Sequence, residues 1–324
     1  MMANDNHWAR LWANGASDSF GHGLDERSAQ DAPMAARWRA WFSNLPDGCE
    51  VLDIGTGNGA LLRHLLAART QDPGLRFVGV DAAALPDASN EGAGSAAPVR
   101  ARLLGGVRAE SLPFGDNCFD VVVSQFGIEY ATLPAALSEV GRVLRSGGTV
   151  ALLMHHRGGR PVSLARAERH QAQWLLSALL PAAAPMAEAM SKIGTESGRR
   201  ELADSAHWSA VRATYDRVLA DAGRRMNETM APDLLVDAQN WVAQAFQRAA
   251  QGGAGAGRQA LANIEQLILD QDRRLEDLLQ RALDEDAIRS VVASMNDSGL
   301  KPGVVETAED RGYLMGWWVE ATRI

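Results

Sequence analysis

Cysteine and long apolar runs are both scarce in this chain of 324 residues. Cys49 and Cys118 are the only cysteines, and neither has His or Cys companions at the spacing of a zinc site, so the sequence predicts neither a disulfide framework nor a metal site. No stretch reaches the ~18 consecutive apolar residues of a membrane-spanning helix, and the first residues lack the basic region and apolar run of a signal peptide. We therefore expect a cytoplasmic protein with reduced thiols.

Positive charge is also in short supply. Lys and Arg total 32 against 40 Asp and Glu, which gives a net charge of −8. Nonspecific affinity for nucleic acid depends on clustered Lys and Arg, so this balance disfavours a nucleic-acid-binding function. Hydrophobic residues make up 46% of the chain, which is enough for a sizeable core in one large domain or two of ordinary size.

One segment near the start of the chain combines a strand pattern with a glycine loop. Residues 51–54 read as a buried strand, and residues 60–66 have the periodicity of a helix. Glycines at alternate positions between them allow backbone N–H groups to approach a ligand, and the helix N-terminus adds its dipole. The segment predicts a nucleotide-type ligand site. The loop consists of Gly55, Thr56, Gly57, Asn58 and Gly59.

An acid inside the strand favours one class of ligand over another. The glycines alone also satisfy the relaxed dinucleotide fingerprint, which is a weak signal. Asp53, however, lies two residues before the first glycine, where a dinucleotide fold usually carries an apolar residue, and the glycines continue to Gly59. The resulting pattern Asp-x-Gly-x-Gly-x-Gly resembles motif I of class I S-adenosylmethionine (SAM)-dependent methyltransferases.

The elements downstream follow in the order that this resemblance implies. A second strand ends in Asp81, the fourth and fifth strands lie at residues 119–124 and 149–154, and an amphipathic helix lies between them at residues 133–145. Over residues 45–156 the succession is similar to the family that includes the ubiquinone and menaquinone C-methyltransferases and many small-molecule methyltransferases. It implies an α/β fold, with a Rossmann-like seven-stranded sheet that carries helices on both faces.

The resemblance also implies how SAM is held. Asp53 and the glycine loop are expected beside the methionine portion of SAM. The backbone of Ser124 and Gln125, which follow the fourth strand, is expected to contact the same portion. Asp81 is placed to accept hydrogen bonds from both ribose hydroxyls. We therefore expect the SAM site at the carboxyl edge of the sheet.

Adenine recognition departs from the family pattern. Where the family usually carries an aspartate that accepts the adenine amino group, this chain has Arg108, and a guanidinium has no acceptor. Either Glu110 substitutes, or the backbone at Ala109 recognises adenine while Arg108 stacks on the ring or lies in solvent. Recognition by the Ala109 backbone is the interpretation we prefer.

Residues for proton transfer are expected at the same carboxyl edge of the sheet. Methyl transfer from a sulfonium is an in-line displacement, so the protein supplies mainly alignment and a dry pocket, but an O- or N-acceptor also needs a base. Glu129 follows the fourth strand, and His155 and His156 end the fifth. These three are the predicted catalytic residues, set against the simpler interpretation that each histidine is a hydrogen-bonded structural residue.

Residues 157–285 interrupt the sheet before its last two strands and are rich in helix formers. We expect an all-helical insertion between strands five and six, broken at Pro181 and Pro185, with a flexible connector at residues 252–257. An apolar stripe on its last helix predicts packing within the insertion, which we favour, or a homodimer interface. The expected helices cover residues 162–180, 201–222, 232–251 and 258–283.

A large share of the aromatic residues lies in the N-terminal segment. We expect Trp38 and Trp41 to pack beneath the sheet. Trp8 and Trp12 are expected to belong to a lid over the SAM site, where aromatic side chains would line a cavity for an organic acceptor.

The predicted domain organisation has four parts: an N-terminal aromatic segment (1–44), a SAM-binding core (45–156), a helical insertion (157–285), and a last helix with a strand hairpin (286–324). The resemblance implies SAM-dependent methyl transfer to a small aromatic or hydrophobic organic acceptor, without nucleic-acid or membrane partners. Methylation of a protein side chain is the first alternative. The second is a SAM-binding protein without catalysis that acts through its helical insertion.

Overall fold

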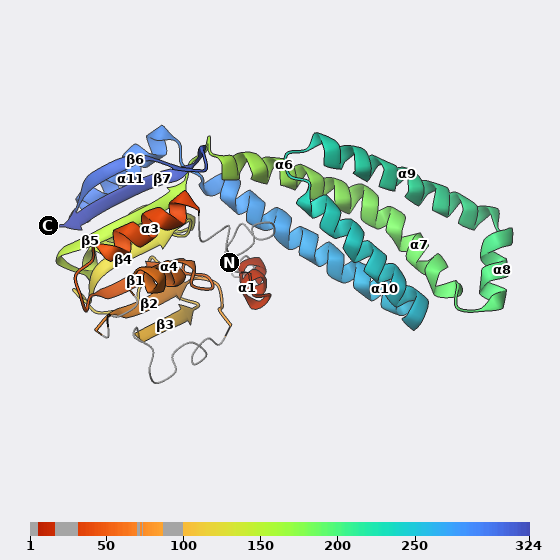
Figure 1. Cartoon of the computed structure of the whole chain (residues 1–324), viewed down its shortest axis with the longest axis horizontal. Coiled ribbons are helices and arrows are strands. Elements are labelled where there is room, and N and C mark those ends of the chain that lie inside the picture. Colours follow the sequence, from red (N-terminus) through yellow and green to blue (C-terminus); the bar gives the residue numbers. More distant parts are fainter. Residues whose placement is uncertain (1–5, 17–31, 70–71, 73, 87–99) are drawn as a thin grey trace. The chain divides into compact units, whose positions relative to one another are not determined.

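The computed structural model describes residues 6–16, 32–69, 72, 74–86 and 100–324 (Figure 1). The chain forms two compact units. The core unit consists of residues 1–163 and 277–324, and the helical unit consists of residues 164–276. None of the helices within the described residues is both long and apolar enough to cross a membrane.

A seven-stranded mixed sheet forms the centre of the core unit, in the order β3-β2-β1-β4-β5-β7-β6. The pairs among β1 to β5 are parallel, whereas β7 runs antiparallel between β5 and β6. The predicted seven-stranded sheet with a displaced final hairpin is confirmed. Because the strand order reverses between β1 and β4, the crevice at their carboxyl ends is the expected ligand position. The strands are β1 Glu50–Ile54, β2 Arg76–Asp81, β3 Arg100–Gly105, β4 Phe119–Gln125, β5 Leu144–His155, β6 Leu300–Asp310 and β7 Tyr313–Arg323.

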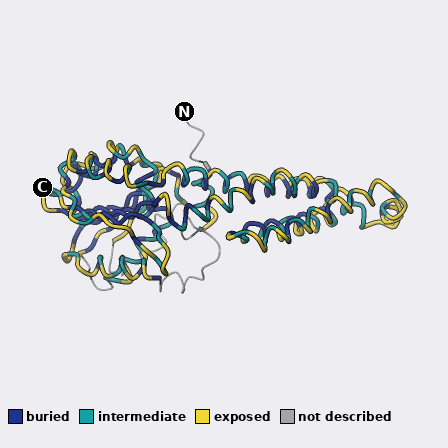
Figure 2. The backbone as a smooth tube through the Cα atoms, turned by 90° about the horizontal axis from the view of Figure 1, so that it is seen from above, coloured by how far each residue is buried: buried dark blue, intermediate teal, exposed yellow. Residues whose placement is uncertain are grey.

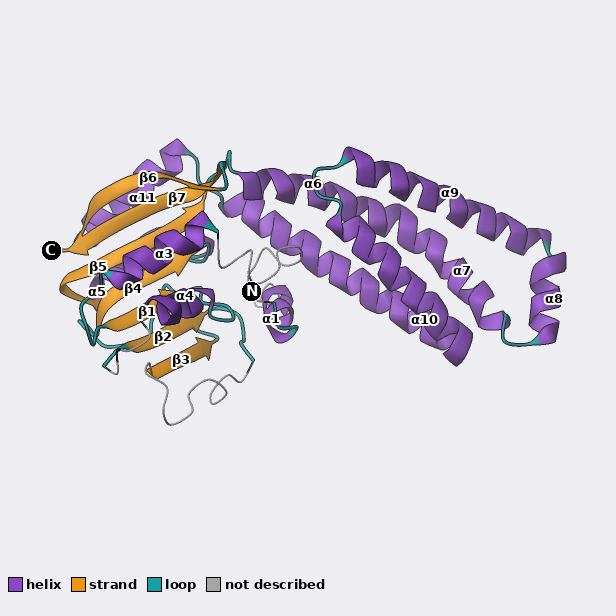
Figure 3. Ribbon diagram, in the orientation of Figure 1, coloured by secondary structure: helices purple, strands orange, loops and turns teal. Residues whose placement is uncertain are grey.

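Helices cover both faces of this sheet (Figure 3). Successive residues of a strand point to opposite faces, so Val51 packs in the cluster with α3 and α4, whereas Leu52 packs in the cluster with α5 and α11. Burial on both faces explains why the inner strands read as near-continuous apolar runs. Figure 2 shows these strands as the buried centre of the unit. The helices are α1 Asn6–Ala13, α3 Pro33–Ser43, α4 Ala60–Ala68, α5 Leu133–Val143 and α11 Glu285–Asp297, with a short 3₁₀ turn η1 at Ile128–Tyr130.

The aromatic residues of α3 pack beneath the sheet, as predicted. Trp38 and Phe42 have no exposed surface, and the Trp38 ring lies 4.6 Å from the ring of Trp318 on β7. Trp41 is partly buried against the same cluster. This helix therefore helps to join the displaced final hairpin to the parallel part of the sheet.

Helices joined by short non-helical segments make up the chain between β5 and β6, which confirms the predicted helical insertion. Apolar and alanine side chains from α6, α7, α9 and α10 form the core of the helical unit. Leu261, Ile264 and Ile268 of the predicted apolar stripe belong to this core, so they pack within the insertion, and the homodimer stays a prediction. The elements are α6 Arg160–Trp174, η2 Leu175–Leu179, α7 Leu180–Lys192, α8 Glu196–Asp204, α9 Ala206–Glu228 and α10 Asp233–Arg281.

Two predicted helix boundaries are wrong. The chain stays helical through Pro181 and Pro185, because the π-helical turn η2 immediately before Pro181 changes the hydrogen-bond register where a proline N–H is missing. The helix expected from residue 201 to 222 is in fact two helices. Ser205 separates them, and its side chain accepts a hydrogen bond from Trp208 N at the start of α9.

The glycine-rich connector is much tighter than expected. Gly253 alone has a non-helical conformation, with φ 81° and ψ 178°, and helix continues on both sides of it within α10. A Cβ atom on Gly257 would lie 2.6 Å from the Cβ of Ala249, so the chain turns back on itself at Gly253. The two predicted helices on either side of the connector therefore form a helical hairpin, and the flexible linker is replaced by a one-residue turn.

Candidate functional site

The glycine loop is fastened to the end of β2. Gly55 N and Thr56 N both donate to Val80 O, at 2.8 and 3.0 Å, and Gly57 N donates to Asp81 Oδ2 at 2.9 Å. These three N–H groups, which were expected to approach a ligand, are thus used within the protein.

The loop after β1 also touches the loop after β4. Gly55 has φ 73°, and a Cβ atom at this position would lie 2.7 Å from the Gly127 Cα. Only glycine combines this left-handed backbone with such a close approach. The sequence therefore brings the ends of β1 and β4 together at the switch point of the sheet.

Asp53 is the most unusual charged group of the site. Its side chain is 1% exposed, and among the described residues neither carboxylate oxygen has a hydrogen-bond partner of good geometry. Burial raises the pKa of Asp53 from 3.8 to about 7, which the Thr56 hydroxyl offsets only in part and the Asp81 carboxylate reinforces. A cationic or hydrogen-donating ligand group beside Asp53 would supply the missing partner.

Asp81 lies at the carboxyl end of β2, where the sequence placed it. Its Oδ2 accepts from Gly57 N and its Oδ1 accepts from Ala83 N, each at 2.9 Å. A carboxylate oxygen can accept more than one hydrogen bond, so these contacts orient the group without exhausting its capacity. Binding of the ribose hydroxyls by Asp81 stays a prediction.

Ser124 and Gln125 take different positions at the end of β4. The Ser124 hydroxyl donates to Ile54 O at 2.7 Å and accepts from Ile128 N at 2.9 Å, so this buried side chain ties β1 to the turn η1. Gln125 Oε1 is buried and lacks a hydrogen-bond partner within the described part of the chain. It is a second orphaned acceptor at the same edge as Asp53.

Arg108 and Glu110 neutralise each other on the predicted adenine side. Their side chains form an ion pair at 3.1 Å, and Glu110 Oε1 also accepts from Thr132 N at 2.9 Å. These hydrogen bonds and the Arg108 charge hold the pKa of Glu110 below its usual value, against the effect of its partial burial. Arg108 is exposed and Ala109 is buried. Adenine recognition by the Ala109 backbone stays a prediction.

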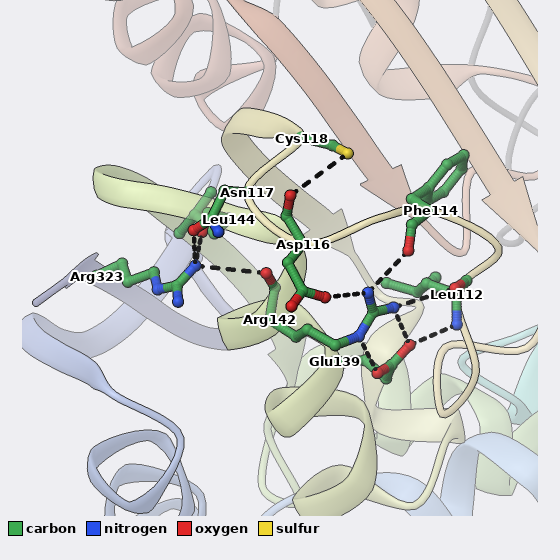
Figure 4. Close-up of polar contacts among 9 residues, drawn as sticks. All are labelled: Leu112, Phe114, Asp116, Asn117, Cys118, Glu139, Arg142, Leu144 and Arg323. Carbon is green, nitrogen blue, oxygen red and sulfur yellow. Dashed lines mark hydrogen bonds and ion pairs between the residues drawn. The ribbon is translucent and has the colours of Figure 1, made fainter.

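An arginine cluster fixes the segment that follows Glu110 (Figure 4). The Arg142 guanidinium on α5 binds Glu139, Asp116 and the carbonyl oxygens of Leu112 and Phe114, at 2.7 to 3.1 Å. Such charge-assisted, multidentate contacts hold a loop without secondary structure. This cluster was not predicted, although the (i, i+3) spacing of Glu139 and Arg142 on one helix is a visible signal in the sequence.

Helix α1 packs on the glycine loop. The Trp12 ring lies so close that a Cβ atom on Gly57 would be 2.7 Å from it, and Asn58 Nδ2 donates to Trp12 O at 3.0 Å. Trp12 is 7% exposed. These contacts place Trp12 where a lid over the loop was predicted, while the role of α1 as a lid remains to be tested.

Asp277, near the end of α10, is a second attachment point that the sequence did not reveal. It accepts hydrogen bonds from His7 Nε2 at 2.8 Å and from Trp8 Nε1 at 3.1 Å. The Trp8 ring in turn meets Tyr130 of η1 edge-on, with the ring centroids 5.5 Å apart. Helix α1 thus joins the glycine loop, the turn after β4 and the end of α10 within the core unit.

Glu129 and His155, two of the three predicted catalytic residues, are in direct contact. Glu129 Oε1 accepts from the His155 backbone N–H at 3.0 Å and contacts His155 Nδ1 at 2.8 Å. Both side chains are buried, at 2% and 0% exposed. The imidazole stacks on the Phe126 ring at 4.2 Å, and Phe126 itself has φ 53°, a conformation that is uncommon for a residue other than glycine.

His156, the third predicted catalytic residue, lies on the other face of the sheet, because adjacent strand residues point in opposite directions. Its Nδ1 accepts from Gly158 N at 2.9 Å, and its ring packs 4.6 Å from that of Trp317. The structure therefore does not bring His156 together with Glu129 and His155. Its contacts are those of a structural histidine in a turn.

No other group of the described residues suggests metal or thiol chemistry. Clusters of three or more His, Cys, Asp or Glu side chains that could hold a metal ion are absent from the residues that the structure describes. Cys49 and Cys118 are free thiols, and burial raises the pKa of Cys49 to about 11, which keeps it protonated.

Comparison with known proteins agrees with this geometry. Residues 52–152 match a family model described as a methyltransferase domain. The ubiquinone/menaquinone biosynthesis C-methyltransferase UbiE of Geobacter sulfurreducens is 32% identical over 133 residues, which cover 40% of this chain and 48% of that protein. The demethylmenaquinone methyltransferase of Roseiflexus castenholzii is 40% identical over 119 residues, covering 36% of this chain and 48% of that protein. The chain thus spans about half the length of these curated relatives.

Among solved structures, a SAM-dependent methyltransferase from Aquifex aeolicus aligns over 93% of this chain and 94% of its own, with 13% identity and a TM-score of 0.41. The fold assignment rests on the strand order and on the matched residues rather than on this weak overall similarity. The chain carries a class I SAM-dependent methyltransferase domain, and SAM is the methyl donor that this family implies.

Proposed function

We propose that the whole protein transfers a methyl group from SAM to a small aromatic or otherwise hydrophobic organic acceptor. The observation that carries the proposal is the buried Asp53 carboxylate, which lacks a partner beside the glycine loop within the described residues. SAM has an ammonium group on its methionine portion and a sulfonium nearby, so it offers the positive charge that this site needs. Nicotinamide dinucleotides would instead place a negatively charged pyrophosphate at the glycine loop, beside the buried Asp53 carboxylate.

The residues of the site have separate tasks in this proposal. Asp53 binds the ammonium group, Asp81 binds the ribose hydroxyls, and Gln125 accepts a further donor of the methionine portion. SAM supplies an electrophilic methyl group when it is bound. The protein contributes alignment and exclusion of water, and alignment alone can be worth ~7 to 11 kcal/mol of the barrier.

The rings around the dyad of Glu129 and His155 support an aromatic acceptor. Tyr130 meets the His155 ring edge-on at 6.2 Å, Phe126 stacks on it, and Trp8 covers Tyr130. Such side chains favour a flat, apolar partner. The printed names of the relatives, which include a 2-phytyl-1,4-naphtoquinone methyltransferase, support an aromatic acceptor class.

Binding of S-adenosylhomocysteine (SAH), the demethylated product, tests the proposal by titration calorimetry. We expect the wild-type protein to bind SAH and not NAD. Asp81→Ala should weaken SAH binding about 10- to 100-fold, because hydrogen bonds to a charged group are lost. Asp216→Ala, on the exposed surface of α9, is the matched control and should leave the affinity unchanged. Failure of the wild-type protein to bind SAH would reject the proposed function, and full affinity in Asp81→Ala would remove Asp81 from the site.

A further inference from the structure

The contact between Glu129 and His155 fixes which imidazole nitrogen carries a proton. Glu129 Oε1 lies 2.8 Å from Nδ1, and an ionised carboxylate can only accept, so the imidazole donates Nδ1–H to it. In the neutral ring the lone pair is then on Nε2. The same Oε1 atom also accepts from the His155 backbone N–H, which prevents the carboxylate from rotating away. A histidine held in this way by a buried acid is arranged to accept a proton at Nε2.

The surroundings separate this dyad from an ordinary buried pair. The second carboxylate oxygen, Glu129 Oε2, is buried and has no hydrogen-bond partner among the described residues, so the acid is not fully compensated by its neighbours. Phe126 takes a left-handed backbone conformation that places its ring against the imidazole. The unpaired oxygen of Glu129 and the strained backbone of Phe126 both lower the stability of the fold. Both residues contact His155 at the carboxyl edge of β5.

Tyr130 does not compete with His155 for the proton. Burial raises the pKa of Tyr130 well above its usual value, and the Glu129 and Asp277 carboxylates raise it further. The hydroxyl therefore stays protonated over the range in which a histidine titrates. The charged groups that act on Tyr130 are Glu129, Asp277 and Arg281, the last of which lowers its pKa in part.

We propose that His155 is the base that removes the hydroxyl proton of a phenolic acceptor, with Glu129 as its positioning residue. This inference rests on the proposed methyltransferase function and narrows the acceptor to a hydroxylated aromatic ring. In the balanced step, the phenolic proton passes to His155 Nε2 and a bond forms between the phenolic oxygen and the methyl carbon. The carbon–sulfur bond of the donor breaks with its electron pair going to sulfur, and the imidazolium, stabilised by Glu129, later releases its proton to solvent. Because the imidazole is fully buried, the acceptor reaches it only after the neighbouring rings move.

The test uses 4-nitrophenol, whose anion alone absorbs visible light, as a probe for the SAH complex of the full-length protein. The fraction of bound probe that is ionised is measured between pH 5 and pH 9. We expect the bound probe to ionise at a pH about one unit lower than the free probe. His155→Gln should abolish this difference, whereas His156→Gln, the adjacent residue on the other face of the sheet, should preserve it.

Glu129→Gln gives a second measurement that a purely structural role would not reproduce. The introduced amide keeps an acceptor oxygen but removes the charge that stabilises the imidazolium, so ionisation of the bound probe should require a higher pH than in the wild-type complex. Nitrogen NMR of the histidine-labelled wild-type protein should show His155 as the Nδ1–H tautomer, which needs no variant to fold.

Three results would overturn the inference: an Nε2–H tautomer, equal probe ionisation in the wild-type and His155→Gln complexes, or no probe binding to a protein that binds SAH. Absence of SAH binding in the same samples would instead reject the methyltransferase function itself. Calorimetry with SAH therefore distinguishes the failure of this inference from the failure of the proposed function.

Discussion

The core unit and the helical unit differ in whether their buried polar groups have hydrogen-bond partners. Within the described residues, the buried side-chain atoms that lack a hydrogen bond belong to the core unit, among them both oxygens of Asp53, Gln125 Oε1 and Glu129 Oε2. In the helical unit, the buried Gln171 accepts a hydrogen bond from Arg225 and the buried Asp270 accepts one from Gln266. The core unit retains unpaired polar groups where a ligand can supply the missing hydrogen bonds. In the helical unit, these two buried polar groups are paired within the protein, which favours stability.

The two units also use glycine and alanine for different purposes. The core of the helical unit is lined by small side chains, which let its helices approach closely. In the core unit, small residues instead allow loops to approach each other. Gly55 and Gly127 are an example, because the backbones of their two loops meet next to the predicted ligand position. The buried alanines of this core are Ala172, Ala182, Ala183, Ala187, Ala238, Ala245, Ala249 and Ala260.

The largest expected effect comes from neutralising Asp53. Its pKa is raised from 3.8 to about 7 in the folded protein, so the ionised carboxylate destabilises the apo protein. The contribution of Asp53 to the free energy of unfolding is fully present below the pKa that this residue has in the unfolded chain. It is lost as the pH rises through about 7, by roughly 4 kcal/mol in total. Asp53→Asn should therefore stabilise the apo protein at pH 8, but not at pH 4, while it weakens SAH binding. Urea unfolding at several pH values measures the difference.

Asp72 provides a control of opposite sign. Burial alone would raise the pKa of Asp72, but hydrogen bonds from the Arg69 guanidinium and from Gly48 N hold it below its usual value. Stability from Asp72 is therefore present above its unfolded pKa and lost as the pH falls through its lower folded pKa. Asp72→Asn should destabilise the protein at pH 8. If both variants changed stability in the same direction there, the distinction between a ligand-poised acid and a structural acid would fail.

A pair of glycine substitutions gives a smaller effect and compares the units directly. Gly55 and Gly253 both have positive φ angles, of 73° and 81°. A Cβ atom at Gly55 would strike the Gly127 backbone, whereas nothing among the described residues lies within 4 Å of one at Gly253. With ψ 178°, Gly253 lies in a region that essentially only glycine adopts, so Gly253→Ala should cost about 1 to 3 kcal/mol, the penalty of the backbone conformation alone. Gly55→Ala should cost more and also reduce SAH affinity. Equal costs, measured by urea unfolding, would show that the loop contact between β1 and β4 can relax.

The smallest effect concerns the helix boundary at Ser205 in the helical unit. Its hydroxyl accepts from Trp208 N and caps α9, so Ser205→Ala should cost ~1 kcal/mol in the free energy of unfolding. Ser209→Ala, four residues into the same helix, is the control and should cost less, because it removes no cap. Neither change should alter SAH affinity, and a loss of affinity in Ser205→Ala would mean that the helical unit contributes to the cofactor site.

Local patterns predicted the sheet well because its inner strands are buried on both faces and therefore appear in the sequence as near-continuous apolar runs. The glycine loop and Asp81 could be placed because each lies at the end of an apolar strand, where parallel sheets present ligands, and Asp53 stood out as an acid inside such a strand. The contact between Glu129 and His155 could not be predicted as a contact. It depends on β4 and β5 being neighbours and on the turn of Phe126, which no spacing in the sequence encodes.

The errors in the helical unit have local causes. Prolines were read as helix breaks, but the π-helical turn before Pro181 accommodates the missing N–H. Ser205 caps a helix in the middle of a sequence that has continuous helical periodicity, so the break was hidden. Asp277 was missed for a different reason, because its partners His7 and Trp8 are at the opposite end of the chain.

The displaced hairpin has a consequence for how the chain folds as it is synthesised. Strand β5 pairs with β7, where His155 lies opposite Gly316, so the entire helical insertion emerges from the ribosome before β5 obtains its second neighbour. Until then β5 is an open edge of apolar residues, the kind of surface that joins other chains. The helices of the insertion form through contacts close in sequence and can fold in this interval. We expect the nascent protein to be most prone to aggregation between the completion of β5 and the arrival of β7.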